Sequence, residues 1–215
     1  TDKEDKVVGY LIAAAFTDDL RFFGTEPERL KYMEDVKSKM TVKFEEPPIS
    51  VFVAIETRQD FEFNTCELSM PKCWKKAAGG FSHLYPNGMK ERVVPITKYD
   101  ENILKIEPTE DEIKAARDLP FREILGVMSF PASCCKFEMK YAISVLGSRR
   151  GGWSVKHFGV VLKVFEYGVH TCEIGLMYSK GLDPRGENTL YAYADASLGV
   201  PRSYGCRIVM MNGAA

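Results

Sequence analysis

The chain has 215 residues and a formal net charge of −1 at pH 7, with 45% hydrophobic and 27% charged residues. This composition is that of a globular protein, and it excludes collagen, a long coiled coil and a fully disordered chain. The length predicts one domain or two small halves, and the polar start at Thr1 leads us to expect a piece of a longer protein. The longest apolar run, Val7 to Phe16, is shorter than the ~20 residues of a membrane-spanning helix, so we expect no membrane partner.

Hydrophobic periodicity, capping residues and breaks at glycine or proline predict a mixture of strands and helices. In the first part these are strands over residues 7–15 and 20–23, a helix from Glu26 to about Met40, strands over residues 50–57 and 61–63, and a short basic helix over residues 69–81. In the second part they are a helix over residues 109–118, a helix from Pro120, helices over residues 136–146 and 155–167, and strands over residues 173–178, 190–194 and 206–211. Residues 82–108 are expected to connect the two parts. The order predicts an α+β fold, with two subdomains.

Local signals define several of these elements. The first two strands form a hairpin with Asp18 and Asp19 at its tip, and residues 58–60 are the expected turn of the second hairpin. Thr109, followed three residues later by Glu112, is a capping box that starts a helix. Ser154 is the expected N-cap of the last helix.

The six cysteines form no C-x-x-C pair, and adjacent Cys134 and Cys135 cannot easily bond to each other. This usage favours a reduced, intracellular protein over a disulfide framework. His170 and Cys172 are the one close His/Cys pair, and the sequence offers no second pair at zinc spacing, so we expect no structural zinc.

Basic residues concentrate between residues 114 and 180, with aromatic residues among them. The basic set is Lys136, Lys140, Arg149, Arg150, Lys156 and Lys163, and the aromatic set is Phe137, Tyr141, Trp153 and Phe158. Two interpretations stay open. The region forms either a phosphate-contacting face with stacking aromatics or a pair of amphipathic helices with a solvated basic side.

Adjacent carboxylates at a hairpin tip have a definite chemical use. Polymerases hold two Mg²⁺ ions roughly 3.5–4 Å apart, one activating the primer hydroxyl and one steadying the triphosphate. Hard cations take oxygen ligands, and a tight turn brings two carboxylates near one ion pair. Acidic pairs in turns are common, however, so Asp18 and Asp19 need further context before they indicate catalysis.

That context comes from a series of short motifs in one order. Phe16-Thr17-Asp18-Asp19 resembles the Y-x-D-D hairpin of reverse transcriptases, and residues 51–56 (VFVAIE) resemble the Y-F-L-G-I-E strand of copia-type retrotransposon enzymes. Residues 119–126 (LPFREILG) and 141–146 (YAISVL) are similar to that family's P-Y-R-x-L-x-G and A-V-S-x-L segments. Residues 157–158, 162–167 and 175–178 follow its H-W, R-x-L-R-Y-L and G-L-x-Y series. Residues 191–197 (YAYADAS) and 202–214 resemble the first two strands of the attached RNase H domain.

The resemblance implies a fragment of a Pol polyprotein in three parts. Residues 1–64 would be the end of the reverse transcriptase palm with a primer-grip-like hairpin, residues 65–180 a mostly helical thumb and connection, and residues 181–215 the start of an RNase H-like domain. It implies that Asp18 and Asp19 hold Mg²⁺ for polymerisation and that Asp195 holds Mg²⁺ for RNA cleavage. Nucleic acid would contact Phe16 near the incoming nucleotide, and Phe52, Ala54 and Glu56 along the primer.

The same resemblance implies that both carboxylate sets are incomplete. The third palm aspartate would lie upstream of the chain and the remaining RNase H acids downstream, so we expect little Mg²⁺ binding or activity from the chain alone. Phe16 stands in place of the family's Tyr, and Ala54 in place of a Gly. The implied partners are an RNA or DNA template–primer and the rest of the Pol polyprotein, in a cytoplasmic retroelement particle or the nucleus. Two alternatives stay open: a non-catalytic remnant that binds nucleic acid or protein, and an unrelated domain with accidental motif matches.

Overall fold

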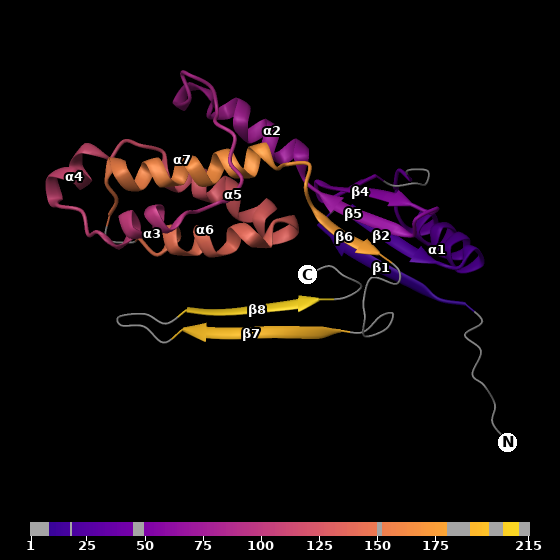
Figure 1. The fold of residues 1–215 in the computed structure, drawn as a ribbon. Coiled ribbons are helices and arrows are strands. Elements are labelled where there is room, and N and C mark those ends of the chain that lie inside the picture. Colours follow the sequence, from indigo (N-terminus) through magenta and orange to yellow (C-terminus); the bar gives the residue numbers. More distant parts are fainter. Residues whose placement is uncertain are drawn as a thin grey trace. The chain divides into compact units, whose positions relative to one another are not determined.

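The computed structural model describes residues 9–17, 19–44, 50–149, 152–179, 190–197 and 204–210. The chain divides into two compact units, Thr1–Val53 and Ala54–Ala215. Antiparallel strands and helices make up both units, so the α+β expectation is confirmed (Figure 1). The three-part division at residues 64 and 180 follows the resemblance and stays a prediction.

The first unit contains the predicted acidic hairpin and the helix that follows it. Strands β1 (Leu11–Phe16) and β2 (Asp19–Gly24) pair in antiparallel fashion, and helix α1 spans Glu26–Lys39. Proline and acidic residues occupy the first turn of α1, as the sequence predicts. Phe22 of β2 packs edge-to-face on Tyr32 of α1, with ring centroids 5.4 Å apart, and so joins the hairpin to the helix.

A four-stranded sheet follows, with the strand order β3-β4-β5-β6. Its strands are β3 (Val51–Phe52), β4 (Ile55–Asp60), β5 (Thr65–Ser69) and β6 (Leu176–Ser179). The predicted turn at residues 58–60 is wrong, because these residues belong to β4 and pair with Glu67, Cys66 and Thr65 of β5. The turn lies at residues 61–64, where the Asp60 carboxylate accepts backbone N–H groups at 2.9 and 3.1 Å.

Two turns of this sheet place non-glycine residues in the left-handed region. Val53 and Ala54, between β3 and β4, have φ values of 52° and 61°, and Asn64, before β5, has φ of 51°. Asparagine tolerates this conformation, but a β-branched valine is a rare occupant of it. The tight turn at Val53 and Ala54 is therefore held against local preference.

The helices between β5 and β6 enclose the main hydrophobic core. They are α2 (Pro71–Gly80), α3 (Lys98–Lys105), α4 (Glu110–Ala115), α5 (Phe121–Cys135), α6 (Lys140–Gly147) and α7 (Val155–His170). Short 3₁₀ turns lie at Ser82–Leu84 and Phe137–Met139. Helix α7 packs against α2, α3, α5 and α6, and its apolar face fills the centre of this helical part (Figure 1).

Close approach of α2 and α7 depends on a glycine. Trp74 of α2 is 1% exposed, and its ring lies 6.3 Å from that of Phe165 on α7. A Cβ at Gly168 would lie 2.4 Å from the Trp74 ring, so only glycine fits at this position of α7. The indole therefore packs directly against the backbone of the neighbouring helix.

Most of the predicted helices are confirmed, with shifted ends. The capping boxes at Thr109 and Ser154 are present, and α5 begins after Pro120 as expected. The segment 82–108 was expected to be a connection, but it contains helix α3. Thr97 and Asp100 cap this helix reciprocally.

The last two strands form a separate two-stranded hairpin. Strands β7 (Tyr191–Ser197) and β8 (Tyr204–Met210) pair in antiparallel fashion, with Asp195 opposite Cys206. This pairing agrees with the strands expected over residues 190–194 and 206–211. Among the described residues, no helix is both long and apolar enough to cross a membrane.

Candidate functional site

The Phe-x-Asp-Asp sequence lies at a two-residue turn. Phe16 is the register partner of Asp19, so Thr17 and Asp18 alone join β1 to β2. Thr17 adopts φ of 51°, and the Phe16 side chain is 56% exposed. Asp18 lies outside the described residues, and Asp19 is described only by its backbone at the start of β2. The pairing of β1 with β2 therefore confirms the expected hairpin, and the role of the two acids stays a prediction.

Asp195 has an exposed side chain on β7. Within the described ranges, no group of three or more His, Cys, Asp or Glu side chains could hold a metal ion. Mg²⁺ needs several oxygen ligands because it gives up its water reluctantly. The described residues therefore do not by themselves fit a magnesium site, and no catalytic step through Mg²⁺ follows from them.

The primer-grip-like residues lie around the strained turn of the sheet. Phe52 is half-buried on β3, and Ala54 is exposed at the turn. Glu56 on β4 has a side chain that is 17% exposed and forms an ion pair with Lys72 at 3.4 Å. Glu56 thus joins the sheet to the first turn of α2, and the turn itself presents Ala54 to solvent.

Lys136, predicted to bind nucleic acid, is instead buried. The residue is 1% exposed, and its ammonium donates to the carbonyl oxygens of Thr171 and Ile174 at 2.9 and 3.3 Å. Its Nζ also lies 3.3 Å from Glu138 and 5.5 Å from the ring of Tyr167. These contacts stabilise the C-terminal end of α7, where a positive charge is favourable. A phosphate at the surface cannot reach this ammonium, which corrects the prediction for Lys136.

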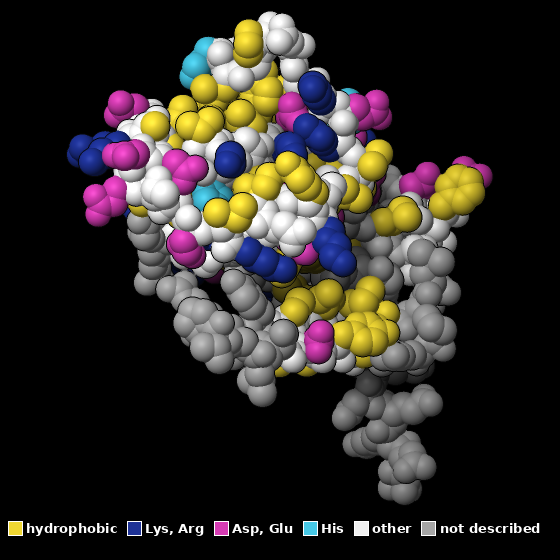
Figure 2. Space-filling model, turned by 60° about the vertical axis from the view of Figure 1, so that its left-hand side comes forward, with side chains coloured by type: hydrophobic (Ala, Val, Ile, Leu, Met, Phe, Trp, Pro, Cys, Tyr) yellow, Lys and Arg dark blue, Asp and Glu magenta, His cyan; other side chains and the backbone are white. Residues whose placement is uncertain are grey.

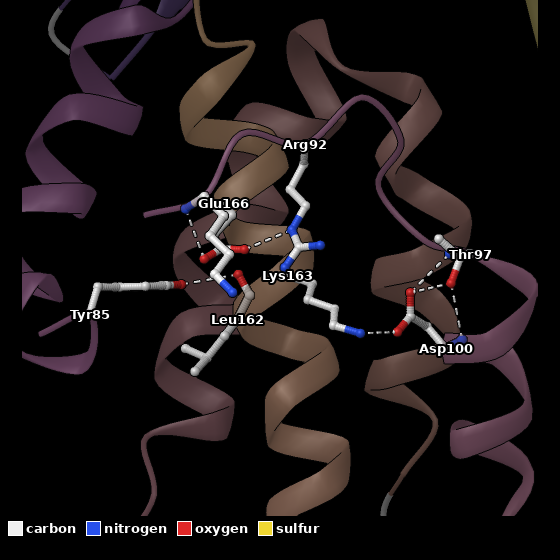
Figure 3. Close-up of polar contacts among 8 residues, drawn as sticks. Tyr85, Arg92, Thr97, Asp100, Leu162, Lys163 and Glu166 are labelled. Carbon is white, nitrogen blue, oxygen red and sulfur yellow. Dashed lines mark hydrogen bonds and ion pairs between the residues drawn. The ribbon is translucent and has the colours of Figure 1, made fainter. Parts of the chain in front are cut away.

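Lys163 helps fasten the segment before α3 onto α7 (Figure 3). Its ammonium lies 2.6 Å from Asp100, whose side chain is 3% exposed. Burial alone would raise the pKa of Asp100, but hydrogen bonds from Lys163 and Thr97 lower it below its ordinary value. The charge of Lys163 is thus balanced within the fold.

Two further contacts extend this attachment along α7. Glu166, which is 6% exposed, accepts a hydrogen bond from Arg92 Nε at 2.8 Å and one from the Lys90 backbone N–H at 3.1 Å (Figure 3). The Tyr85 hydroxyl donates to the Leu162 carbonyl at 3.0 Å. Burial and the nearby Glu166 raise the pKa of Tyr85, so the phenol stays protonated. Residues 85–100 therefore run along α7 as a bonded strap.

The remaining basic residues differ in their surroundings. Arg149 is 11% exposed, and it donates to the Ile106 carbonyl at 3.3 Å and to Glu107 at 3.0 Å. Lys140 is exposed and donates to Ser133 at 2.7 Å, and Lys156 is exposed at the start of α7. Arg150 lies outside the described residues. On the face drawn in Figure 2, the described Lys and Arg side chains lie in separate groups among hydrophobic and acidic ones, without a continuous basic surface.

One cavity of about 280 Å³ lies where the start of α5, the end of α6 and Trp153 meet. Its lining residues are Phe121, Arg122, Leu125, Leu146, Gly147, Arg149 and Trp153. Arg149 and Trp153 are among the residues that the sequence pattern indicates, whereas Arg122 is not. Arg122 belongs to the LPFREILG motif. Its guanidinium lies over the ring of Trp153, a residue of a distant segment, so only the fold shows that the two are neighbours.

His157 is a structural histidine of the helical part. It is 1% exposed; its Nδ1 accepts the Ser154 backbone N–H at 3.0 Å, and its Nε2–H donates to the Ile103 carbonyl at 3.1 Å. Burial, followed by the positive charge of Arg149, lowers the pKa of His157 below its ordinary value. The imidazole therefore stays neutral at pH 7 and caps α7.

Comparison with known proteins gives no relative for this chain. No protein-family model matches it, and neither the search of curated proteins nor the search of solved structures found a match. The resemblance to copia-type enzymes therefore rests on the order of short sequence motifs alone.

Proposed function

We propose that the chain is part of a copia-type retrotransposon reverse transcriptase, which copies RNA or DNA templates and degrades the RNA strand. The observation that carries this proposal is the antiparallel pairing of β1 with β2, in which Phe16 is the register partner of Asp19. The collinear motifs that follow support it. The helices would then belong to the thumb and connection, and β7 with β8 to the start of RNase H.

In this proposal, Asp18 and Asp19 supply two carboxylates to a site that residues outside the chain complete. Mg²⁺ at such a site would activate the primer hydroxyl and steady the triphosphate. Asp195 would serve an RNA-cleaving site in the same way. The isolated chain is then expected to show no Mg²⁺-dependent primer extension above background, with no further loss in Asp18→Asn. Extension that Asp18→Asn abolishes would contradict the incomplete carboxylate set.

The turn at Val53 and Ala54 would contact the primer strand. Ala54 is exposed, and its left-handed backbone forms the tip of the β3–β4 turn. A small side chain there lets the backbone approach a phosphodiester, and a carboxylate there would repel one. Contact at this turn is therefore testable without the catalytic step.

Binding of an RNA–DNA hybrid to the whole chain tests this contact. Ala54→Asp introduces a residue that tolerates φ of 61° and adds a negative charge, so we expect roughly tenfold weaker binding of the hybrid. Asn64→Asp is the matched control, because it adds the same charge at φ of 51° in the neighbouring turn and should change affinity less than about twofold. Fluorescence anisotropy at ~50 mM and ~200 mM salt measures both. Equal loss in the two variants, or no hybrid binding by the unmodified chain, would overturn the proposed contact.

A second candidate is a non-catalytic component that binds nucleic acid or protein. Two observations favour it. The helical part has its own buried core, and the described residues contain no group of side chains that could hold a metal ion. Both candidates share an intracellular setting, with the first placing the protein in a retroelement particle or the nucleus. An affinity for the RNA–DNA hybrid that Ala54→Asp leaves unchanged would favour this second candidate.

A further inference from the structure

We propose that the cavity formed by α5, α6 and Trp153 binds the phosphate group of a nucleotide, with Arg122 and Arg149 as its two cationic ligands. This site shares no residue with the acidic hairpin or the β3–β4 turn, and it does not depend on a polymerase function. It rests on a partly apolar cavity of about 280 Å³ whose lining includes both arginines.

Arg122 is held in position by an aromatic stack. Its guanidinium carbon lies 5.4 Å from the centroid of the Trp153 ring, which itself stacks on Phe121 with centroids 4.6 Å apart and planes 13° apart. The Trp153 Nε1–H donates to the Ala116 carbonyl at 3.1 Å, which fixes the indole. A guanidinium stacked on a ring keeps its N–H edge available for a bidentate contact with an oxyanion.

The charge of Arg122 is not balanced within the described part of the chain. Arg122 is exposed, and among the described residues its contact is the Trp153 ring rather than a carboxylate. Holding a cation over an aromatic ring without an acidic partner leaves its electrostatic field directed at solvent and at the cavity it lines. The cavity therefore favours an anionic occupant.

Arg149 supplies a second, more deeply placed guanidinium. Its side chain is 11% exposed, whereas that of its partner Glu107 is 86% exposed. The Ile106 carbonyl accepts a hydrogen bond from the same nitrogen, so Arg149 stays in place when the exposed Glu107 moves. Phosphate oxygens would then share or replace the contact that Glu107 makes.

The rest of the lining determines which phosphate compounds fit. Phe121, Leu125, Leu146 and Trp153 give the cavity an apolar wall, and its volume lies near the lower end, ~300 Å³, of small-ligand sites. Inorganic phosphate would make no contact with this apolar wall, whereas a nucleotide has a sugar and a planar base that could pack against it. Gly147 is part of the lining, and a Cβ built on it would meet no atom within 4 Å.

Calorimetric titration of the whole chain with adenosine monophosphate, at ~50 mM salt, tests the proposal. Binding with a dissociation constant below about 1 mM is expected, with at least tenfold weaker binding in Arg122→Gln and in Arg149→Gln. Gly147→Leu adds a bulky side chain to the lining and should weaken binding at least tenfold. The matched controls are Lys98→Gln, which removes an exposed charge on α3, and Gly159→Leu, which adds the same side chain at an uncrowded position of α7. Both should bind like the unmodified chain.

Three further probes make each outcome decisive. Adenosine without a phosphate should not bind, and inorganic phosphate should bind at least tenfold more weakly than the nucleotide; equal binding of either would overturn the proposal. A short oligothymidine strand identifies the source: Arg122-dependent binding at least tenfold tighter than the mononucleotide places the phosphate in a strand, and weaker binding places it in a free nucleotide. An acidic peptide that displaces the nucleotide at lower concentration would overturn it.

Two controls separate this test from folding and from the proposed function. Arg122 is exposed, so Arg122→Gln should unfold at the same urea midpoint as the unmodified chain. Its nucleotide affinity therefore tests the proposal even where Arg149→Gln fails to fold. Ala54→Asp should leave nucleotide binding unchanged. Loss of nucleotide binding with retained hybrid binding, or the reverse, shows which of the two proposals fails.

Discussion

The helical part between β5 and β6 and the two-stranded hairpins β1–β2 and β7–β8 differ in how their residues are packed. In the helical part, Ile124, Met128 and Val164 are 0% exposed, whereas Ile12 of β1 and Tyr193 of β7 are 62% and 55% exposed. An isolated two-stranded hairpin is only marginally stable in water. The two hairpins therefore expose large hydrophobic side chains, whereas the arginine-lined cavity lies in the helical part, where such side chains are buried.

The largest test of this contrast is Trp74→Ala. Removing a 1% exposed indole that fills the space beside Gly168 should lower the unfolding free energy of the helical part by about 3–5 kcal/mol. Ile12→Ala, at a 62% exposed position, should change stability by less than about 0.5 kcal/mol. Urea unfolding followed by far-ultraviolet circular dichroism measures both. Similar losses in the two variants would remove the distinction between the regions.

A smaller effect is expected for Lys136→Met, which tests whether a buried charge belongs to the core. Methionine fills much of the same volume but leaves the carbonyl oxygens of Thr171 and Ile174 without the ammonium. The expected loss is about 2–3 kcal/mol. Lys140→Met, at an exposed position of α6, should cost less than about 0.5 kcal/mol. An unchanged urea midpoint in Lys136→Met would show that the ammonium is not needed inside the fold.

The pH dependence of the helical part sharpens the comparison further. Because burial and Arg149 lower the pKa of folded His157, the unfolded chain binds a proton more readily than the folded one. The stabilisation is complete above the ordinary histidine pKa of about 6.5 and is lost as pH falls below it toward the folded pKa. The urea midpoint, followed by far-ultraviolet circular dichroism at pH 8, 7, 6 and 5, should therefore decrease as the pH falls.

His157→Gln is the variant that assigns this pH dependence. It should flatten the decline between pH 7 and 5. The matched control is His170→Gln, which makes the same replacement at an exposed position 3.5 Å from Glu91. A decline that persists in His157→Gln would assign the pH dependence to other groups.

The smallest effect is expected at the strained turn between β3 and β4, which lies outside the two compared regions. Ala54→Gly and Val53→Asn replace residues at φ of 61° and 52° by residues that adopt this region more easily. Each should raise the melting temperature, by an amount equivalent to about 0.4–1 kcal/mol. Calorimetry measures the change, and Ala54→Val should act in the opposite direction. A lower melting temperature for Ala54→Gly would mean that the alanine methyl makes a contact that outweighs the strain.

Local chemistry made much of the fold predictable. Thr109 with Glu112 marked a helix start correctly, and Pro120 marked another. The same signal is weaker at Thr97 and Asp100, because an aspartate replaces the more common glutamate and the helix has only eight residues. In the second hairpin, Phe61 and Phe63 suggested a strand, yet they are 80% and 68% exposed in the turn that Asp60 organises.

Long-range contacts were the part that sequence reasoning could not provide. Lys136 looked like a surface cation because nothing near it in sequence shows that the end of α7 would cover it. The pairing of Arg122 with Trp153 likewise joins residues from separate elements. The β1–β2 hairpin, by contrast, depends only on local sequence signals, and its prediction was confirmed.

The pairing of β5 with β6 has a consequence for how the chain could be rebuilt. Leu68 and Leu176 are register partners, and Gly175 lies so close to the Leu68 carbonyl that a side chain would collide with it. Everything from α2 to α7 therefore leaves the sheet and returns to it at adjacent strand ends, as an insertion into a hairpin. A short loop from β5 to β6 could replace the whole insertion, and the helices could be moved as a cassette into another antiparallel sheet.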